Sequence, residues 1–320
     1  MDIYVFLFRQ TLLFSIPLLI VALGGLFSER SGVVNIALEG IMIMSAFGSI
    51  LFMHYMQVHE IMEGQLLLIV CLVLAGIIGG LFSLLHAFAS INMKADQTIS
   101  GTALNLFAPA FGVFFAKTLF GGVDSVRFSN QFIIDEVPIL SNIPIIGDFF
   151  FTRFYITTFI GIAILIITWL YLYKTKTGMH IRACGENPHA VDSAGISVYK
   201  TRYLGVVLSG VLAGIGGLIY VIPITTEFSS DVAGYGFLAL AVLIFGNWKP
   251  GRIAVVAFFF GAAQTLAVTY TGVPFLINLG IPGVVFKLLP YVATLLLLAF
   301  TSKNSAAPKA VGEPYDKGKR

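Results

Sequence analysis

Long apolar runs, separated by short polar or charged stretches, cover most of this chain. A helix that crosses the hydrocarbon of a bilayer needs about 20 apolar residues. The runs predict nine membrane spans, with eight to ten as the acceptable range, at residues 11–27, 38–56, 65–90, 98–117, 154–173, 203–222, 233–246, 252–270 and 284–300. The run at 233–246 is short, which indicates a tilted or broken helix. The segment 271–283 is apolar but interrupted by Gly and Pro, and we interpret it as a re-entrant piece, which is tolerated where protein surrounds it.

Composition supports this interpretation. Hydrophobic residues make up 58% and charged residues 11% of the 320 positions, and the mean hydropathy is +0.93. A soluble domain carries about 25% charged residues, so lipid is the solvent for most of this chain. We predict an all-α, polytopic bundle of transmembrane helices as one domain, residues 1–302, followed by a disordered cytoplasmic tail, residues 303–320. The apolar run after Arg9 lacks a small-residue cleavage motif, so it is interpreted as a first span rather than a signal peptide.

The placement of charge predicts an orientation. The loop 174–202 and the tail after Ser302 each carry five basic residues, and the turn 246–252 carries two. The stretch 121–152 is mainly acidic. Because basic loops of membrane proteins face the cytoplasm, we expect the loop, the turn and the tail there. An even number of predicted spans separates each pair of these basic segments, and the same count places 121–152 and the N-terminus outside.

A polar island, Gly178–Ile196, interrupts the apolar pattern and predicts a short surface helix with both ends specified. Asn187 is suited to cap its N-terminus. Pro188 fits the first helical position, where no amide donor is needed. Gly195 supplies the left-handed residue that ends a helix. A capped cytoplasmic helix on a membrane protein is a natural docking site for a soluble partner.

Motifs of enzyme chemistry are not found in the sequence. The nearest match to a phosphate-binding loop, 112–118, lacks the second glycine and lies inside an apolar span. The five histidines form no helical ligand pair, and no Gly-x-Ser-x-Gly elbow is present. Cys71 and Cys184 are expected at different levels of the membrane, so we predict neither a disulfide nor a metal site. No catalytic residue, cofactor or nucleic-acid partner is expected.

Ionisable residues inside spans are costly and often functional. The candidates are Glu39, Asp96, Lys117, Glu227, Asp231 and Lys287. Most lie near predicted span ends, and Asp96 is suited to cap the fourth span. Asn35 and Glu39 are four residues apart and share one helix face. That polar face is suited either to line a wet path or to bind a neighbouring helix, and the sequence leaves both open.

Small residues form two Gly-x-x-x-Gly pairs, Gly76 with Gly80 and Gly210 with Gly214. Such faces let helix backbones approach closely in lipid. Packing within one subunit is the preferred interpretation, and a seam between two subunits is the alternative.

Three separated stretches carry a resemblance to a known family: Ser28–Gly40, Lys94–Asn105 and Gly185–Ile196. Together they resemble the permease subunit of a bacterial ABC importer of the branched-chain amino acid and ribose permease superfamily, in its nucleoside and simple-sugar subgroup. The general importer pattern, Glu-Ala-Ala, three residues and Gly, is matched here only at Ala190 and Gly195. His189 replaces the acidic residue, and Val191 replaces a small one.

The resemblance implies an all-helical fold in the bacterial plasma membrane, in contact with lipid. It also implies a cytoplasmic ATPase, a second permease that is a related, non-identical chain, and an external lipoprotein or periplasmic protein that delivers substrate. The polar island then resembles the coupling helix that docks on the ATPase, through Gly185, Glu186, Asn187, Pro188, His189, Ala190 and Gly195. The mechanism that the resemblance implies is alternating access, driven by the ATPase on the other chain.

A nucleoside in the path requires amide and hydroxyl partners beside an aromatic or apolar wall. Asn35, Glu39, Asn105 and Gln264 are the candidate polar residues of the path. Nucleosides are the expected substrate, and simple sugars such as ribose are the alternative. A stand-alone secondary carrier is a further alternative, and it would need no docking helix. An integral-membrane enzyme would need clustered catalytic side chains near one membrane face, and none is found in the sequence.

Overall fold

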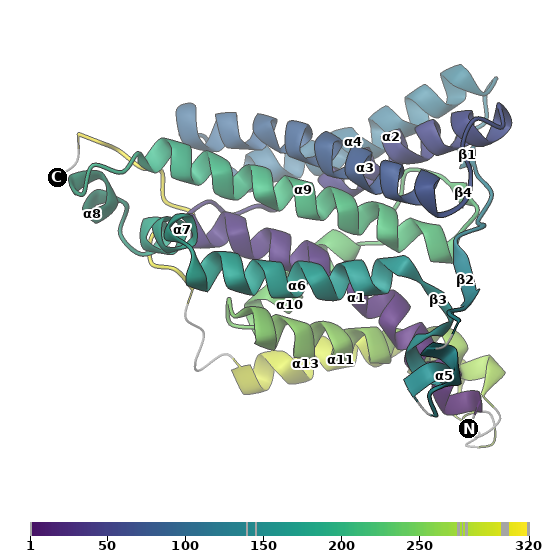
Figure 1. Cartoon of the computed structure of the whole chain (residues 1–320). Coiled ribbons are helices and arrows are strands. Elements are labelled where there is room, and N and C mark those ends of the chain that lie inside the picture. Colours follow the sequence, from purple (N-terminus) through teal and green to yellow (C-terminus); the bar gives the residue numbers. More distant parts are fainter. Residues whose placement is uncertain are drawn as a thin grey trace.

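The computed structural model is a bundle of long helices aligned roughly along one axis (Figure 1). It describes residues 2–138, 140–144, 146–273, 276, 278, 281–301 and 307–318. Seven of the described helices are long and apolar enough to cross a membrane: α1 (Asp2–Arg30), α2 (Leu38–Val58), α3 (Gly64–Ala87, continued by a π-helical turn, Phe88–Asn92), α4 (Gln97–Leu119), α6 (Ile156–Lys174), α9 (Val198–Ile224) and α11 (Pro250–Thr269). The protein is therefore a multi-pass membrane protein.

Two further apolar helices complete the predicted pattern. α10 (Tyr235–Phe245) has only 11 residues, and α13 (Gly283–Thr301) has 19. Each of the nine predicted spans thus overlaps a helix of the structure. The run 233–246, predicted to be tilted or broken, contains the short α10, which begins after the left-handed Gly234. Of the predicted re-entrant segment 271–283, residues 274, 275, 277, 279 and 280 lie outside the described residues.

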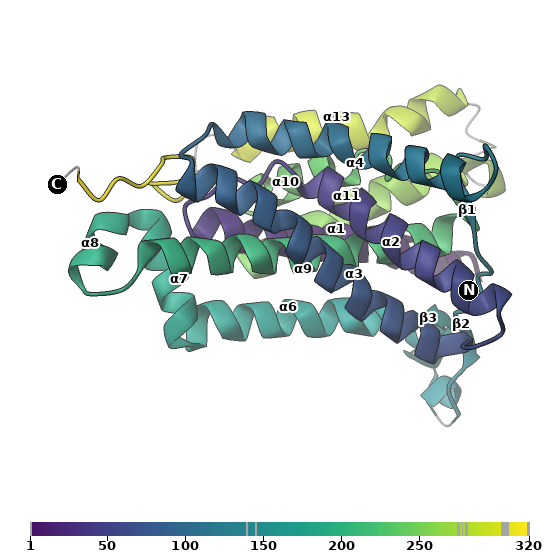
Figure 2. The ribbon, with the colours of Figure 1, turned by 90° about the horizontal axis from the view of Figure 1, so that it is seen from above.

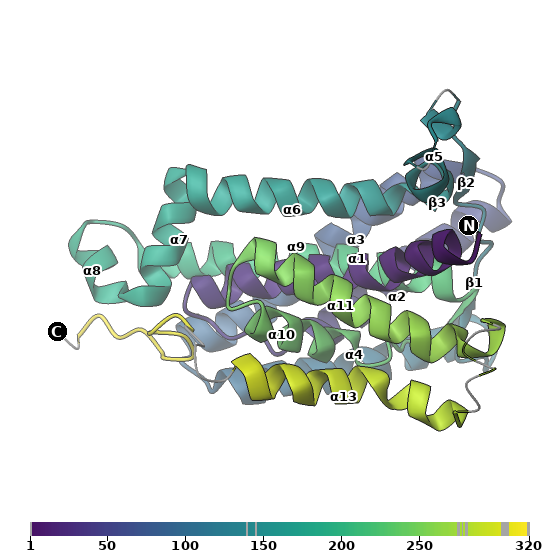
Figure 3. The same cartoon turned by 90° about the horizontal axis from the view of Figure 1, so that it is seen from below.

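α1 and α9 form the centre of the bundle. α1 packs against α9, α11 and α10, and α9 packs against α1, α2 and α3. Figure 1 shows α2, α3 and α4 on one side of this pair and α11 and α13 on the other. Seen from above, α6 and α13 lie on opposite flanks (Figure 2), and from below, α11 and α13 run side by side (Figure 3). The core is the set of apolar side chains between these layers, and in α1 it runs without a break from Leu18 to Leu23.

Both glycine pairs lie where α3 packs against α9. A Cβ atom built on Gly210 would collide with Ser83 and with the carbonyl oxygen of Gly79, and one built on Gly214 would collide with the carbonyl oxygen of Ala75. The close approach of the two backbones therefore requires glycine. Packing within one subunit, the preferred interpretation of these motifs, is what the structure shows.

The two ends of the bundle carry different short elements. One end, named here the α8 end, carries α7 (Lys176–Glu186), α8 (Pro188–Ser193) and the described part of the C-terminal segment (Figure 1). The opposite end carries the N-terminus, η2 (Leu140–Asn142), α5 (Ile146–Phe150) and two antiparallel ribbons, β1 (Val126–Arg127) with β4 (Glu227–Phe228) and β2 (Ile133–Glu136) with β3 (Thr152–Tyr155). A single turn, η3 (Tyr270–Gly272), follows α11. The predicted grouping of the basic segments away from 121–152 agrees with this arrangement.

Part of the polar tail, for which the sequence predicts disorder, contacts the bundle in the structure. Residues 307–318 pack against the α8 end, with Ala310 and Tyr315 each 6% exposed. A tail with few apolar residues cannot build its own core, which is why composition indicates disorder. Here the few apolar side chains are buried against other parts of the protein, and composition does not report such tertiary contacts.

Candidate functional site

The predicted surface helix is present with the expected ends. Asn187 Oδ1 accepts the Ala190 N–H at 3.1 Å, Pro188 occupies the first turn of α8, and Gly195 has a φ of +78°. The residues predicted to dock a partner are Gly185–Ala190 and Gly195, and they differ in exposure. Glu186, Asn187, His189, Ala190 and Gly195 are exposed, whereas Gly185 and Pro188 are buried beneath them. The motif therefore presents one polar, rigid face at the α8 end of the molecule.

The end of α1 connects this helix to the bundle. Arg30 forms an ion pair with Glu186, with 3.6 Å between Nη1 and Oε1, and donates from Nη2 to the Trp248 carbonyl oxygen at 2.9 Å. The indole N–H of Trp248 donates to Glu29 Oε2 at 2.5 Å. Trp248 lies in the turn between α10 and α11. These contacts connect the end of α7 to α1 and to the turn that follows α10.

Segment 31–37, which follows α1, enters the bundle without helical structure. His86 Nε2 donates to the Val34 carbonyl oxygen at 2.8 Å, and the Val34 N–H donates to Gln97 Oε1 at 2.7 Å. Asn35 Nδ2 donates to Ser209 Oγ at 2.9 Å, and the Asn35 side chain is fully buried. Non-helical backbone inside a membrane needs such partners, because no water is available to satisfy it.

α2 and α10 begin close to each other inside the bundle. Glu39, in the first turn of α2, accepts the Gly234 N–H at 2.8 Å and the Gly236 N–H at 2.5 Å. Both amides belong to the start of α10, which runs from there to Phe245 over about 15 Å at 1.5 Å per residue. The carboxyl group of Glu39 therefore lies at the amino ends of two helices, where the helix dipoles favour negative charge. We name this contact the Glu39 junction.

Asn105 on α4 holds the same region from the other side. Its Oδ1 accepts the Gly40 N–H at 2.7 Å, and its Nδ2 donates to the Ile36 carbonyl oxygen at 2.9 Å. Three of the four residues predicted to line a path, Asn35, Glu39 and Asn105, are thus engaged in holding the start of α2. The structure brings these three together, and Gln264 lies apart from them.

Gln264 lines a cavity of about 820 Å³ between α10, α11 and α13. Its walls are largely apolar and aromatic, including Phe237 and Tyr270, and the polar groups in it are few. They belong to Gln264, Thr271, Lys287 and Thr294 together with Tyr235. Small-molecule sites have this character, an apolar concavity with a few placed polar groups. The Glu39 junction adjoins one wall of the cavity, because Gly234 belongs to both.

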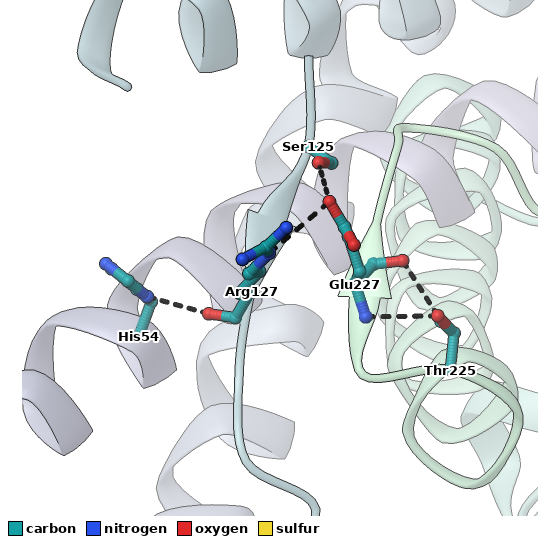
Figure 4. A network of polar contacts seen from close by, with 5 residues as sticks. All are labelled: His54, Ser125, Arg127, Thr225 and Glu227. Carbon is teal, nitrogen blue, oxygen red and sulfur yellow. Dashed lines mark hydrogen bonds and ion pairs between the residues drawn. The ribbon is translucent and has the colours of Figure 1, made fainter. Parts of the chain in front are cut away.

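A polar network closes the opposite end of the bundle (Figure 4). The Ser125 hydroxyl donates to Glu227, whose Oε1 lies 3.6 Å from Arg127 Nε. His54, in the last turns of α2, donates from Nδ1 to the Arg127 carbonyl oxygen at 2.7 Å. The Ser125 hydrogen bond and the charge of Arg127 lower the pKa of the Glu227 carboxyl from its ordinary value. This network fastens the β1–β4 ribbon to the end of α2.

The sequence indicated some of these residues and missed others. Asn35, Glu39, Asn105 and the α8 motif stand out as polar groups in apolar surroundings. His86 and Gln97 were not singled out, although both hold segment 31–37. The only sequence signal for His86 is a titratable residue inside an apolar span. Among the described residues, no group of three His, Cys, Asp or Glu side chains could hold a metal ion.

Comparisons with known proteins place the chain among permeases. The family described as branched-chain amino acid transport system / permease component matches residues 7–298, and the chain belongs to this family. It is thus one component of a multi-part transport system.

The sequence similarity to individual relatives extends along almost the whole chain. It is 43% identical to the guanosine ABC transporter permease protein NupQ of Bacillus subtilis, over 97% of this chain and 96% of that one. It is 42% identical to the nucleoside ABC transporter permease protein NupC of Lactococcus lactis, over 96% of each chain. Similarity to a second permease of that organism, the nucleoside ABC transporter permease protein NupB, is lower, with 26% identity over 95% of this chain and 84% of that one.

Proposed function

We propose that this protein is the membrane-spanning permease subunit of an ABC importer that moves nucleosides across the plasma membrane of a bacterium. The observation that carries the proposal is the identity of 42–43%, over nearly the full length, to permeases named for guanosine and for nucleosides. The described architecture supports it, with a rigid polar helix at one end and a cavity beside a broken helix inside the bundle.

In this proposal the α8 end faces the cytoplasm and docks a separate ATPase through Gly185–Ala190 and Gly195. The excess of basic residues in 174–202 supports this sidedness. The sequence contains no phosphate-binding loop of its own, so the hydrolysis of ATP belongs to the partner. A second, non-identical permease completes the pathway, and the occurrence of two nucleoside permeases, NupC and NupB, in one organism supports a mixed pair. An external lipoprotein or periplasmic protein delivers the substrate.

Transport follows from the contacts between α8 and the bundle. Displacement of α8 reaches α1 through the Arg30–Glu186 ion pair and reaches the turn after α10 through Trp248. Because the other end of α10 is held by Glu39, these two contacts set the position of the whole half-helix. A tilt of α10 would open or close the cavity that Gln264 lines. A solute shifts this balance only by the difference between its affinities for the two states.

Gln264 is the residue that we expect to recognise the substrate. An amide offers a donor and an acceptor to the edge of a nucleobase, and Phe237 and Tyr270 supply apolar walls for its faces. The Gln264→Leu substitution keeps the approximate size but removes both polar groups. Loss of such a hydrogen-bonding group in a binding site costs about 1–3 kcal/mol, so the KM for nucleosides should rise about 10-fold or more.

Uptake measurements test the proposal. Cells that lack their own nucleoside uptake should accumulate labelled guanosine when this chain is produced with its ATPase, its partner permease and its binding protein. Excess unlabelled nucleosides should compete, and ribose should not. Competition by ribose alone would assign the system to simple sugars. Accumulation by purified permease alone, in sealed vesicles without any ATPase, would identify a secondary carrier and refute the proposal.

A further inference from the structure

The C-terminal segment, residues 307–318, lies across the α8 end and contacts parts of the chain that are far apart in sequence. In Figure 1 it is the yellow trace that runs beside α7 and α8 to the end marked C. It contacts α7, α8, α9, the loop before α4 and segment 31–37. None of the proposed transport roles requires this segment, and its composition alone predicts a disordered tail.

Two main-chain hydrogen bonds hold its middle. The Ala310 N–H donates to the Gly185 carbonyl oxygen at 2.8 Å, and the Gly312 N–H donates to the Gly32 carbonyl oxygen at 3.3 Å. Gly185 is the buried residue at the start of the docking motif. Gly32 lies at the beginning of segment 31–37, which leads to the Glu39 junction. Two residues of the C-terminal segment, two positions apart, thus connect these two sites.

A buried charge depends on the same segment. The guanidinium of Arg202, on α9, is 1% exposed and donates from Nη1 to the Glu313 carbonyl oxygen at 2.8 Å. A buried charge is stable only when acceptors replace the water that it has lost. The Glu313 carbonyl is one of those acceptors, so removal of the segment would leave Arg202 poorly satisfied. Burial raises the pKa of the neighbouring Cys184 thiol, against the opposing effect of the Arg202 charge.

Tyr315 fixes the far end of the segment against the docking helix. Its side chain packs with Cys184, Val191 and Val198 in one small apolar cluster. The ring centroids of Tyr315 and His189 lie 5.2 Å apart. An ion pair between Lys94 Nζ and Asp316 Oδ1, at 3.3 Å, attaches the segment to the loop before α4. His189 and Val191 are on α8, so the C-terminal segment packs directly against the docking helix.

We propose that residues 307–318 form a strap that links α8 to segment 31–37 and carries the displacement of α8 to the Glu39 junction. Tyr315 is the positioning residue at the α8 end of the strap, and Gly312 is the attachment at the other end. The strap acts in parallel with the Arg30–Glu186 ion pair. This inference extends the proposed docking role of α8, and it assigns a coupling role to a segment that composition marks as a disordered tail.

The Tyr315→Ala and Gly312→Val variants test the strap. The first removes the apolar contact with α8, and the second conflicts with the Gly312 φ of +82°. Lys317→Ala is the matched control, because Lys317 is exposed in the same segment. In vesicles that hold the complete transporter, we expect both variants to keep the ATPase bound and to keep ATP hydrolysis within about two-fold of wild type. Nucleoside uptake per ATP hydrolysed should fall about 10-fold.

Unchanged uptake per ATP in both variants would overturn the strap. A loss of uptake and hydrolysis together, caused by release of the ATPase, would also overturn it, because the segment would then serve docking alone. If the wild-type transporter moves no nucleoside in these vesicles, the proposed function is refuted instead.

A measurement on the isolated permease tests the link without any solute or ATPase. Amide hydrogen exchange should speed up in Tyr315→Ala both in α8 and in residues 31–37, although Tyr315 packs on α7, α8 and α9. The Lys317→Ala control should exchange as wild type does. Faster exchange confined to α7–α9 in Tyr315→Ala would show that the two sites are not linked through the segment.

Discussion

Glu39 shows how one side chain determines the position of a helix. Its two carboxyl oxygens accept the Gly234 and Gly236 amides, and its own helix begins one residue earlier, at Leu38. Hydrogen bonds to a charged group contribute about 1.5–3 kcal/mol each. At 6% exposure, Glu39 has little access to solvent that could replace them. Glu39 thus holds the start of α10, and under the proposed function it would affect transport through the position of that helix.

The Glu39→Gln substitution tests this role. The glutamine side chain keeps one oxygen that can accept a backbone N–H. Its NH₂ group, which is a donor, faces the other backbone N–H, so one amide at the start of α10 loses its acceptor. We expect a loss of about 2–3 kcal/mol in stability, measured as a lower thermal midpoint of the purified protein. Uptake should fall as well.

The exposed Glu63→Gln variant is the matched control and should behave as wild type. A thermal midpoint for Glu39→Gln equal to that of the control would contradict a holding role for Glu39.

The ionisation of Glu227 leads to a prediction about how the stability of the protein depends on pH. Its pKa is lowered in the folded protein by the Ser125 hydrogen bond and by Arg127. The stabilisation by the ionised group is therefore complete above the unfolded pKa of about 4.3 and is lost as the pH falls through the lower, folded value. Between about pH 6 and about pH 3, the thermal midpoint should fall less in Glu227→Gln than in wild type. Parallel pH profiles would show that the network in Figure 4 contributes nothing to stability.

At the scale of elements, the α3–α9 contact depends on the absence of side chains. Gly210 approaches Gly79 and Ser83 so closely that one methyl group does not fit. Overpacking of this kind costs about 1–3 kcal/mol. We expect Gly210→Ala to lower the thermal midpoint in detergent.

Gly251→Ala, at a position with open space in the first turn of α11, is the control for that variant. Alanine there should be neutral or slightly stabilising. If both variants unfold at the same temperature, the close approach of α3 and α9 does not determine stability.

The docking helix makes a second prediction at this scale. Gly195 ends the α8 region with a φ of +78° and has open space around it. A β-branched residue there strains the backbone by roughly 1–2 kcal/mol and should tilt α8 without disturbing the core. We expect Gly195→Val to insert normally while its uptake and its retention of the ATPase decrease.

Gly121→Val imposes the same kind of strain, at a φ of +63°, on the opposite end of the molecule. That variant should keep the ATPase. Wild-type uptake in Gly195→Val, with the ATPase still bound, would remove the docking role of α8.

At the scale of the whole molecule, the two ends of the bundle are chemically distinct. The α8 end gathers the basic segments and the strap, and the opposite end gathers the acidic stretch 121–152 with the β ribbons. If the α8 end is cytoplasmic, a membrane-impermeant thiol reagent applied to intact cells should label Asp124→Cys and not Lys317→Cys. Inverted vesicles should show the reverse pattern. Both substitutions belong in a Cys71→Ala, Cys184→Ala background, and the reverse pattern in intact cells would invert the orientation.

The fold and the docking motif were largely predictable from local chemistry. Apolar runs of bilayer length specify helices whatever their neighbours are, so each predicted span overlaps a helix. The capping of α8 by Asn187, Pro188 and Gly195, and that of α4 by Asp96, are likewise contacts within a few residues. Such contacts depend on residues adjacent in the chain, and for this reason the sequence contains them.

Tertiary structure alone decided what the polar residues inside the bundle do. Asn35, Glu39 and Asn105 are visible in the sequence, but their partners lie on α9, α10 and α2, up to 197 positions away. The order of residues 307–318 has the same origin, because Tyr315 and Arg202 are buried only by contacts between distant segments. The sequence by itself determined where the helices are and how α8 is capped, since short-range hydrogen bonding and hydropathy fix both. Which groups hold the helices together, and which one faces a cavity, depends on long-range packing and was decided only by the folded arrangement.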